Sequence, residues 1–554
     1  MRRRMFLSGS SILAGVGLLA LAGCEPPWRS RGEGPDASTS AASGGAGSGS
    51  ASASASGSAG ASGGSGQGVT RTVTTVGATL EVTVGPAVVS DDVMVVPLVV
   101  HLVKAGSSSP STPGFSPHLV WNGTGSFTGA DGVRLVDFDA GTVQETFKAS
   151  SESTGLSEEE PDATLHALFK PVDAKTINVL VPESGLFEGV PVVRDGKLSD
   201  EAKKALEYVN TTENTPDPVA LETFTASVDG ASDTRVADKS VVINLASDVL
   251  FASDSADLSS QADATLKKAA DQLATYPGGE VSIVGHTDDV ADDAHNLDLS
   301  KRRATSVSDR LGQLTNMSAF SVSTDGKGES TPRVPNDSDG NRQLNRRVEI
   351  TLVPTQAASS TSSPDASKGT GQGGGDLPQA EGPVAKGSEG VTVTRGNSED
   401  KMTFVLTEVT RRGTYLVGEV KATGGTGGTQ TGPADWLQPT QLDGSARGEE
   451  DNNLLGAVTG LSLLTPQTRY YPVDYTVAEG THHPLSEITA NNKLTAGDAT
   501  TLTVVWPDTG QDTVTLDLEP STRATRPNNP FRLTDIWSAW CFSDWGSFSS
   551  RESI

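Results

Sequence analysis

Two tracts of small and polar residues divide this 554-residue chain and limit how it can fold. Residues 25–68 are mostly Gly, Ser and Ala, and residues 355–388 are rich in Ser, Gly and Pro. Such sequences have too few apolar side chains to offset the entropy lost on folding, so we expect both to be disordered linkers. As a flexible coil of about 44 residues, the first tract spans about 35–40 Å. The remaining sequence must then fold as separate domains, as its length also requires.

The composition excludes several classes of function. A formal net charge of −27 argues against nucleic-acid binding, because phosphate contacts need clustered Lys and Arg. Two cysteines, Cys24 and Cys541, are too few for a disulfide framework or a cysteine-based metal site. We interpret the adjacent His482 and His483 as an exposed loop, since no third ligand has a suitable spacing. No metal or other cofactor is therefore expected.

The first 24 residues have the pattern of an export signal. Arg2–Arg4 supplies positive charge, Ile12–Leu21 is an apolar run too short to span a bilayer, and Leu21–Cys24 reads LAGC. This segment resembles a bacterial lipoprotein signal with a twin-arginine-like start, which implies cleavage after Gly23 and lipid attachment to Cys24. The alternative is an uncleaved membrane anchor. Since no later apolar run has transmembrane length, we expect the mature protein to be tethered to a membrane and not threaded through it.

Two regions have the alternating pattern of β-strands. In residues 69–235, alternation in Thr79–Val84 and Thr176–Val181 indicates a β-sandwich, with one helix expected at Ser199–Val209. In residues 389–535 we expect further strands, at Val391–Thr394, Thr403–Val409, Thr414–Val420, Thr500–Val505 and Thr513–Leu518. Thr176–Pro182 resembles Thr501–Pro507, so the two domains are either duplicated copies or alike by chance. The Trp-rich tail, residues 536–554, either docks on the second of them or stays exposed to bind a partner.

Residues 236–354 have a different pattern. Strands are expected at Val241–Leu245, Val281–Val284, Phe320–Ser323 and Val348–Val353. One expected helix begins after an N-cap at Asp257 and the other contains Ala304, Val307, Leu311 and Leu314 on one face. This β-α-β-α-β-β order predicts helices on one face of a mixed sheet. We therefore predict a multidomain chain in which this α+β domain is flanked by two mainly β, sandwich-like domains.

An acid and a guanidinium in this central region form a candidate binding site. Asp288 lies just past the end of an expected strand, and Arg303 lies in the helix that follows. A carboxylate binds an ammonium and a guanidinium binds a carboxylate in a bidentate pair, so the two together suit a zwitterion. The segment has no nucleophile.

Four motifs around this pair resemble the OmpA-like peptidoglycan-binding family. The motifs are Gly285–Asp288, Asn296 with Leu299–Ala304, Gly326–Pro332, and Asn345–Ile350. The resemblance implies that Asp288 and Arg303 hold the diaminopimelate of the peptidoglycan stem peptide. It also implies that Thr287 belongs to the site, that Asn296 holds the loop after Asp288 in place, and that Arg347 or Arg346 supports the residues that contact the ligand. It covers about a fifth of the chain, the size of one domain.

Two departures from the family pattern occur in these motifs. The loop Asp289–Asp293 lacks the usual Gly and is rich in carboxylates, which either repel the ligand carboxylate or recruit a cation such as calcium. Lys327 stands where an aromatic residue is common. We interpret Asp337–Asn341 as a structural turn.

These observations favour a non-catalytic, lipid-anchored envelope protein that ties membrane to cell wall, with β domains that act as spacers or bind envelope proteins. One alternative is a wall-modifying enzyme that uses the central domain for targeting, although no motif of an activated nucleophile is visible. Another is a surface adhesin or receptor whose β domains bind a protein.

Overall fold

The computed structural model describes residues 67–106, 130, 132–147, 156, 158–194, 196–207, 217–356, 376–395, 399–429, 431–437, 457–477, 482–486, 493–520 and 529–540. The expected export signal, with Cys24, and nearly all of the first Gly/Ser tract lie outside these residues, as do most of the second tract and Cys541. Within them, no helix combines the length and apolar character needed to cross a membrane.

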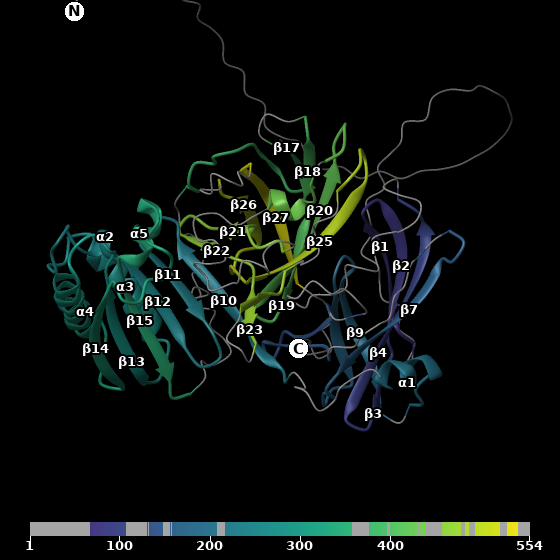
Figure 1. The fold of residues 1–554 in the computed structure, drawn as a ribbon, viewed down its shortest axis with the longest axis horizontal. Helices are drawn as coiled ribbons and strands as arrows, with labels where there is room; N and C mark the ends of the chain where they lie inside the picture. Colours follow the sequence, from purple (N-terminus) through teal and green to yellow (C-terminus); the bar gives the residue numbers. More distant parts are fainter. Residues whose placement is uncertain are drawn as a thin grey trace, which may run out of the picture. The chain divides into compact units, whose positions relative to one another are not determined.

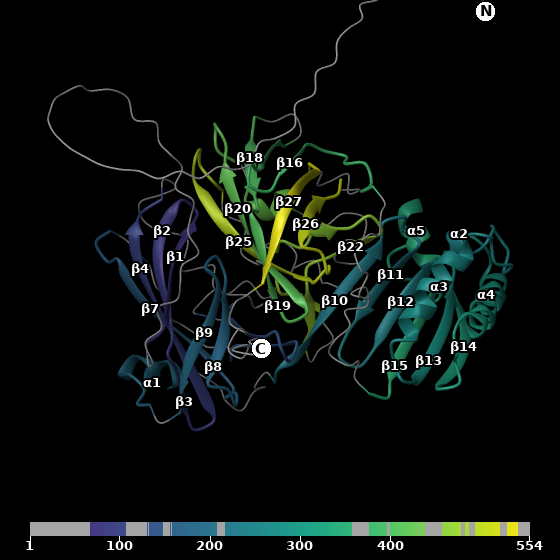
Figure 2. The ribbon, with the colours of Figure 1, turned by 180° about the vertical axis from the view of Figure 1, so that it is seen from behind.

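Residues 69–207, the first β domain, form two sheets around an apolar core (Figures 1 and 2). In one sheet β4 pairs with β2, β3 and β7, and in the other β8 pairs with β5 and β9. Side chains alternate as the sequence predicts, because Leu80 and Val82 of β2 are buried and Glu81 is exposed. The elements are β1 (Val69–Thr75), β2 (Ala78–Val84), β3 (Ala87–Ser90), β4 (Val93–Lys104), β5 (Arg134–Asp137), β6 (Thr142–Glu145), β7 (Asp162–Phe169), β8 (Thr176–Val181), β9 (Gly185–Val193) and α1 (Asp200–Glu207).

Residues 241–354, the central domain, have the predicted β-α-β-α-β-β order with two short helices added, α2 after the first strand and α5 before the last, and helices pack on one face of a mixed sheet (Figure 1). Strand β13 lies between β14, to which it is parallel, and β15, and β15 pairs in turn with β12. The apolar stripe of α4 packs on this sheet with Ala304, Val307 and Leu311 buried. The elements are β12 (Val241–Ala246), α2 (Ser247–Leu250), α3 (Ala262–Leu273), β13 (Gly279–His286), α4 (Asp293–Leu314), β14 (Phe320–Gly328), α5 (Asp339–Asn345) and β15 (Arg347–Pro354).

Two local predictions in the central domain are wrong. Asp257 does not cap α3, which begins five residues later, at Ala262, because Leu258 is instead bridged to Phe251. Gln261 occupies the N-cap position without a side-chain hydrogen bond, and the Ser259 hydroxyl accepts a hydrogen bond from the Ala262 amide at 3.2 Å. The expected turn at Asp337–Asn341 is the start of α5, where the Ser338 side chain accepts from the Asn341 amide.

Residues 376–540, the second β domain, surround a core that contains Phe404, Trp506 and Phe531. Strand β20 pairs with β18, β19 and β25, while β27 pairs with β16, β19 and β26. The elements are β16 (Val384–Lys386), β17 (Val391–Thr394), β18 (Lys401–Val405), β19 (Glu408–Arg412), β20 (Tyr415–Gly424), η1 (Pro433–Trp436), β21 (Ser462–Leu464), β22 (Thr468–Tyr470), β23 (Asp474–Thr476), β24 (His482–Pro484), β25 (Ala499–Pro507), β26 (Thr513–Leu518) and β27 (Phe531–Trp540).

Three expectations for this domain need correction. The expected linker 355–388 contains β16, which is ordered by its parallel pairing with β27. The expected tail at 536–554 begins inside β27, where Trp537 is 67 % exposed. The expected strand Thr403–Val409 is two strands, β18 and β19.

The similarity between Thr176–Pro182 and Thr501–Pro507 does not extend to strand pairing, since β8 pairs with β5 and β9 and β25 with β20.

Strands β10 (Val219–Ser227) and β11 (Ser232–Val236) join all three regions. Strand β11 pairs with β12 of the central sheet, and β10 pairs with β11, with β6 of the first β domain, and with β22 and β23 of the second. The expected domain boundary at residue 235 thus falls inside a continuous run of paired strands. The two β domains, far apart in sequence, also share an apolar cluster of Val136, Phe138, Val143, Leu180, Leu221, Tyr415, Val417, Val473, Tyr475, Leu485 and Val505.

Candidate functional site

The loop between β13 and α4 carries the predicted site residues. Strand β13 ends at His286, and α4 begins at Asp293. A Cβ atom added to Gly285 would lie 2.1 Å from the Ser300 carbonyl oxygen, so only glycine lets the end of β13 approach α4 this closely. The approach sets Asp288, on the loop, beside the helix that carries Arg303.

The carboxylate of Asp288 is held in place by its neighbours. Oδ2 accepts a hydrogen bond from Arg346 Nη1 at 2.7 Å, and Oδ1 lies 3.4 Å from the Val290 amide nitrogen. Arg346 also donates to both carboxylate oxygens of Asp248, at 2.8 and 2.6 Å. The hydrogen bonds to Asp248 and Asp288 outweigh partial burial and raise the pKa of Arg346. Arg346 is thus fully charged and fixes the position of Asp288.

Arg303 is buried, at 5 % exposure, and has no carboxylate within ion-pair distance among the described residues. Its Nε donates to the Ser255 carbonyl at 2.9 Å, its Nη2 lies 3.4 Å from the Ala252 carbonyl, and its guanidinium lies 5.1 Å from the centre of the Phe251 ring. Burial lowers the pKa of Arg303, although the nearby charges of Asp248 and Asp254 oppose this effect. A guanidinium still remains protonated at neutral pH. Arg303 is therefore a buried cation that contacts neutral groups.

Asn296 holds the loop in place, as the family resemblance implies. Its Nδ2 lies 3.2 Å from the Asp288 carbonyl, 3.1 Å from the Ala291 carbonyl and 2.6 Å from Glu329 Oε2. These contacts close the loop on both sides of Val290, whose side chain is 75 % exposed. Asn296 thus holds the loop that presents Asp288.

Thr287 and His286 lie beneath the loop. The Thr287 amide donates to the Gly328 carbonyl at 2.9 Å, while its buried hydroxyl has no hydrogen-bond partner among the described residues. Burial and the nearby charges of Arg347 and Lys327 lower the pKa of His286 to about 3. His286 is therefore neutral at physiological pH and adds no charge to the site.

Of the two arginines that the sequence left open as supports, Arg346 contacts Asp288 and Arg347 does not. Arg347 is buried and donates to Glu349 at 3.3 Å. Val348 and Ile350 of β15 face the helix side, so Arg347 and Glu349 point to the opposite face of the sheet. Of the two, Arg346 is therefore the residue that supports Asp288, while a role of Arg347 in ligand binding stays a prediction.

The acid-rich loop does not present a set of free carboxylates. Asp292 caps α4, because its side chain accepts from the His295 amide at 3.1 Å, and Asp289 accepts from Arg342 Nε at 3.0 Å. Among the described residues, this loop supplies no group of three ligand atoms close enough to hold a metal ion. The supporting residues Asp248 and Arg342 were not anticipated, since nothing in their sequence spacing connects them to Asp288.

A group of that kind does occur elsewhere, at Glu222, Asp474 and His482. Arg235 Nη1 lies 2.8 Å from Glu222 Oε2, 3.1 Å from Asp474 Oδ2 and 3.0 Å from His482 Nδ1, so a guanidinium nitrogen already contacts all three. The expectation that His482 and His483 form an exposed loop is wrong, because they form β24 against β23. This group is an ionic contact between β10, β11 and the second β domain.

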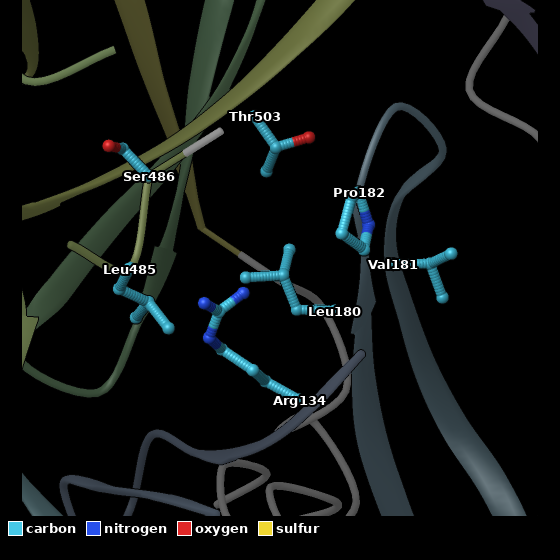
Figure 3. Close-up of a pocket in the computed structure, with 7 residues that line it drawn as sticks. All are labelled: Arg134, Leu180, Val181, Pro182, Leu485, Ser486 and Thr503. Atoms are coloured by element: carbon cyan, nitrogen blue, oxygen red, sulfur yellow. The ribbon is translucent and has the colours of Figure 1, made fainter. Parts of the chain in front are cut away.

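A small cavity lies where the two β domains meet, as Figure 3 shows. It is lined by Arg134, Leu180, Val181, Pro182, Leu485, Ser486 and Thr503. Its volume of about 10 Å³ is the space of one water molecule.

The central domain is similar in sequence to proteins of a known family. Residues 250–346 match the model of the OmpA family. Outer membrane porin F of Pseudomonas aeruginosa is 37% identical over 108 residues, 20% of this chain and 31% of that protein. The probable lipoprotein YiaD of Escherichia coli is 36% identical over 125 residues, 23% of this chain and 56% of that protein. This chain thus spans less than two thirds of either relative.

A solved structure, the cell wall anchor of the T6SS from Pseudomonas aeruginosa, is 32% identical; the match covers 22% of this chain and 88% of that one, with a TM-score of 0.20. The family match includes Asp288, Asn296 and Arg303, and it ends at Arg346. Residues 250–346 of this chain belong to the OmpA family.

Proposed function

We propose that this protein binds peptidoglycan non-covalently through the diaminopimelate of the stem peptide. The observation that carries the proposal is Arg303, a buried guanidinium without a carboxylate partner among the described residues. A buried charge is costly unless it is paired, so this guanidinium, on the helix that packs against the Asp288 loop, indicates an anionic group supplied by a ligand. The membership of residues 250–346 in the OmpA family supports the same ligand.

The free end of diaminopimelate carries an ammonium and a carboxylate on one carbon. The ammonium binds Asp288, which Arg346 holds in position, and the carboxylate binds Arg303. Thr287 and Asn296 position the loop beneath them. No bond is made or broken, so the protein acts as an attachment and not as an enzyme.

We further propose that lipid on Cys24 anchors the protein in a membrane of the cell envelope, so that it ties membrane to wall. The lipoprotein-like pattern at Leu21–Cys24 and the relative described as a probable lipoprotein support this anchor. Membrane fractionation tests it: Cys24→Ser should move the protein to the soluble fraction, and unchanged membrane association would contradict the anchor.

Co-sedimentation of the full-length protein with purified sacculi tests the binding site. Asp288→Ala and Arg303→Ala should each weaken binding by about 2–5 kcal/mol, because each leaves a charged ligand group unpaired. Matched controls on the same loop and helix are Asp289→Ala and Arg302→Ala, whose side chains pair with Arg342 and Asp298 at the surface. Unchanged sedimentation of both site variants contradicts the assignment.

A further inference from the structure

The contacts of Arg303 differ from those of two other buried arginines in this chain, Arg469 and Arg532. Arg469 and Arg532 are as buried, and both pair with Asp517, at 2.9 and 2.7 Å. Arg303 instead contacts two backbone carbonyls and the face of Phe251. The carbonyls take Nε and Nη2, which leaves Nη1 with no hydrogen-bond partner among the described residues.

From this geometry we infer that the site distinguishes a free carboxylate on the stem peptide from a carboxamide, so that amidation of diaminopimelate weakens attachment. The inference rests on the proposed function and deepens it. A carboxylate neutralises the Arg303 charge and accepts hydrogen bonds at both oxygens. A carboxamide has one acceptor oxygen and an NH₂ group, which donates and cannot pair with a guanidinium. The amide therefore leaves a buried cation without a counter-charge.

Acidic residues around the site favour the amidated form of the ligand. Amidation gives the free end of the ligand a net positive charge, which Asp248, Asp254 and Asp289 attract. Each of these carboxylates already has a cationic or imidazole partner, since Asp248 pairs with Arg346, Asp289 with Arg342, and Asp254 contacts His295. All three are 40 % exposed or more, so solvent screens them.

Whether the free or the amidated ligand binds more tightly depends on which is larger, the loss of the contact with Arg303 or the attraction by the acidic residues. Exposed ion pairs change affinity by about fivefold or less. Hydrogen bonds to a buried charge change it by about 10- to 100-fold. The contact with Arg303 therefore dominates, and the free carboxylate is preferred.

Calorimetric titration of the full-length protein with two purified muropeptides tests the inference. Both are disaccharide tetrapeptides, one with free diaminopimelate and one with its side-chain carboxylate amidated. The free form should bind about 10- to 100-fold more tightly. Equal affinity, or tighter binding of the amidated form, overturns the inference and leaves the proposed function standing. Failure of both muropeptides to bind overturns the proposed function itself.

Two variants test whether Arg303 is the residue that distinguishes the free carboxylate from the carboxamide. Arg303→Gln places a neutral amide opposite the ligand, so the two muropeptides should bind with affinities within about threefold of each other. Arg302→Gln is the matched control, because Arg302 is exposed and pairs with Asp298 one helical turn away. It should keep the full preference for the free carboxylate. If Arg303→Gln keeps that preference as well, Arg303 is not the residue that reads the carboxylate.

Discussion

Two arginines in this molecule are held away from solvent in opposite ways. Arg303 of the central domain is 5 % exposed and contacts backbone carbonyls and an aromatic ring. The side chain of Arg235, on β11, is 15 % exposed and pairs with two carboxylates, Glu222 and Asp474. Burial lowers the pKa of Arg303, whereas at Arg235 the two carboxylates outweigh burial and raise the pKa.

Under the proposed function, this contrast separates a ligand-binding arginine from one that acts only within the fold. The counter-charges of Arg235 come from β10 and β23, so its interactions are complete when the chain is folded. No carboxylate of the described residues lies within ion-pair distance of Arg303, so under the proposed function its counter-charge is the ligand carboxylate. If Arg303 binds the ligand carboxylate as proposed, an arginine serves a contact within the fold at one position and ligand binding at the other.

The largest expected effect is on folding stability, and the same substitution tests both positions. Arg235→Met leaves Glu222 and Asp474 as adjacent buried carboxylates and should lower the free energy of unfolding by about 3–5 kcal/mol. Arg303→Met removes an unpaired cation together with its two carbonyl hydrogen bonds. These losses and gains oppose each other, so the free energy of unfolding should stay within about 1 kcal/mol of the parent. Urea denaturation of the full-length variants measures both changes.

A control restores the balance of charge at the Arg235 position. In the triple variant Arg235→Met, Glu222→Leu, Asp474→Leu no buried charge remains, and much of the lost stability should return. Equal destabilisation by Arg235→Met and Arg303→Met would remove the distinction between the two positions.

A smaller effect on folding stability is expected when low pH protonates Glu222, a partner of Arg235. Burial disfavours the Glu222 carboxylate, but the hydrogen bond to His482 and the charge of Arg235 together lower the pKa of Glu222 to about 2, from 4.5. Below pH 4.5 the unfolded state binds more protons than the folded state, so stability falls as pH falls from about 5 to about 2. At neutral pH the ionised form contributes about 3 kcal/mol.

Glu222→Gln isolates this contribution from the other carboxylates. Parent and variant should differ by about 3 kcal/mol in the free energy of unfolding at pH 7, and the difference should shrink toward pH 2. Denaturation at a series of pH values measures it. A difference independent of pH between 5 and 2 would contradict the assigned pairing.

The central domain was predictable because its signals are local. The apolar stripe of α4 and the alternation in β13 each depend on residues a few positions apart. The resemblance offered Arg346 or Arg347 as a support, but the pairing of Arg346 with both Asp288 and Asp248 was not predictable, because these residues meet only after β12, β13 and β15 have paired. Asp292 was mistaken for part of an acidic patch, although an Asp that precedes a helix is a common N-cap.

The second β domain was harder to predict, because its structure depends on contacts between residues that are distant in sequence. Its short strands β21 to β24 contain three residues each, too few for an alternating pattern to be recognised. His482 looked exposed because its partners, Glu222 and Asp474, are distant in sequence and meet it through β10 and β23. Trp537 was assigned to a tail, since its pairing with β19 and β26 involves residues far away.

The smallest expected effect concerns the acid-rich loop beside Arg303. If Asp292 acts as an N-cap, Asp292→Ala should lower the free energy of unfolding by about 1 kcal/mol, and Asp292→Ser should restore most of it. If the loop carboxylates instead repel the ligand carboxylate, Asp292→Ala should tighten muropeptide binding. Because Asp289 is paired with Arg342 and Asp292 with the His295 amide, we expect no tightening. Urea denaturation and muropeptide titration of the two variants separate these roles, and tighter binding without lost stability would show that the loop opposes the ligand of Arg303.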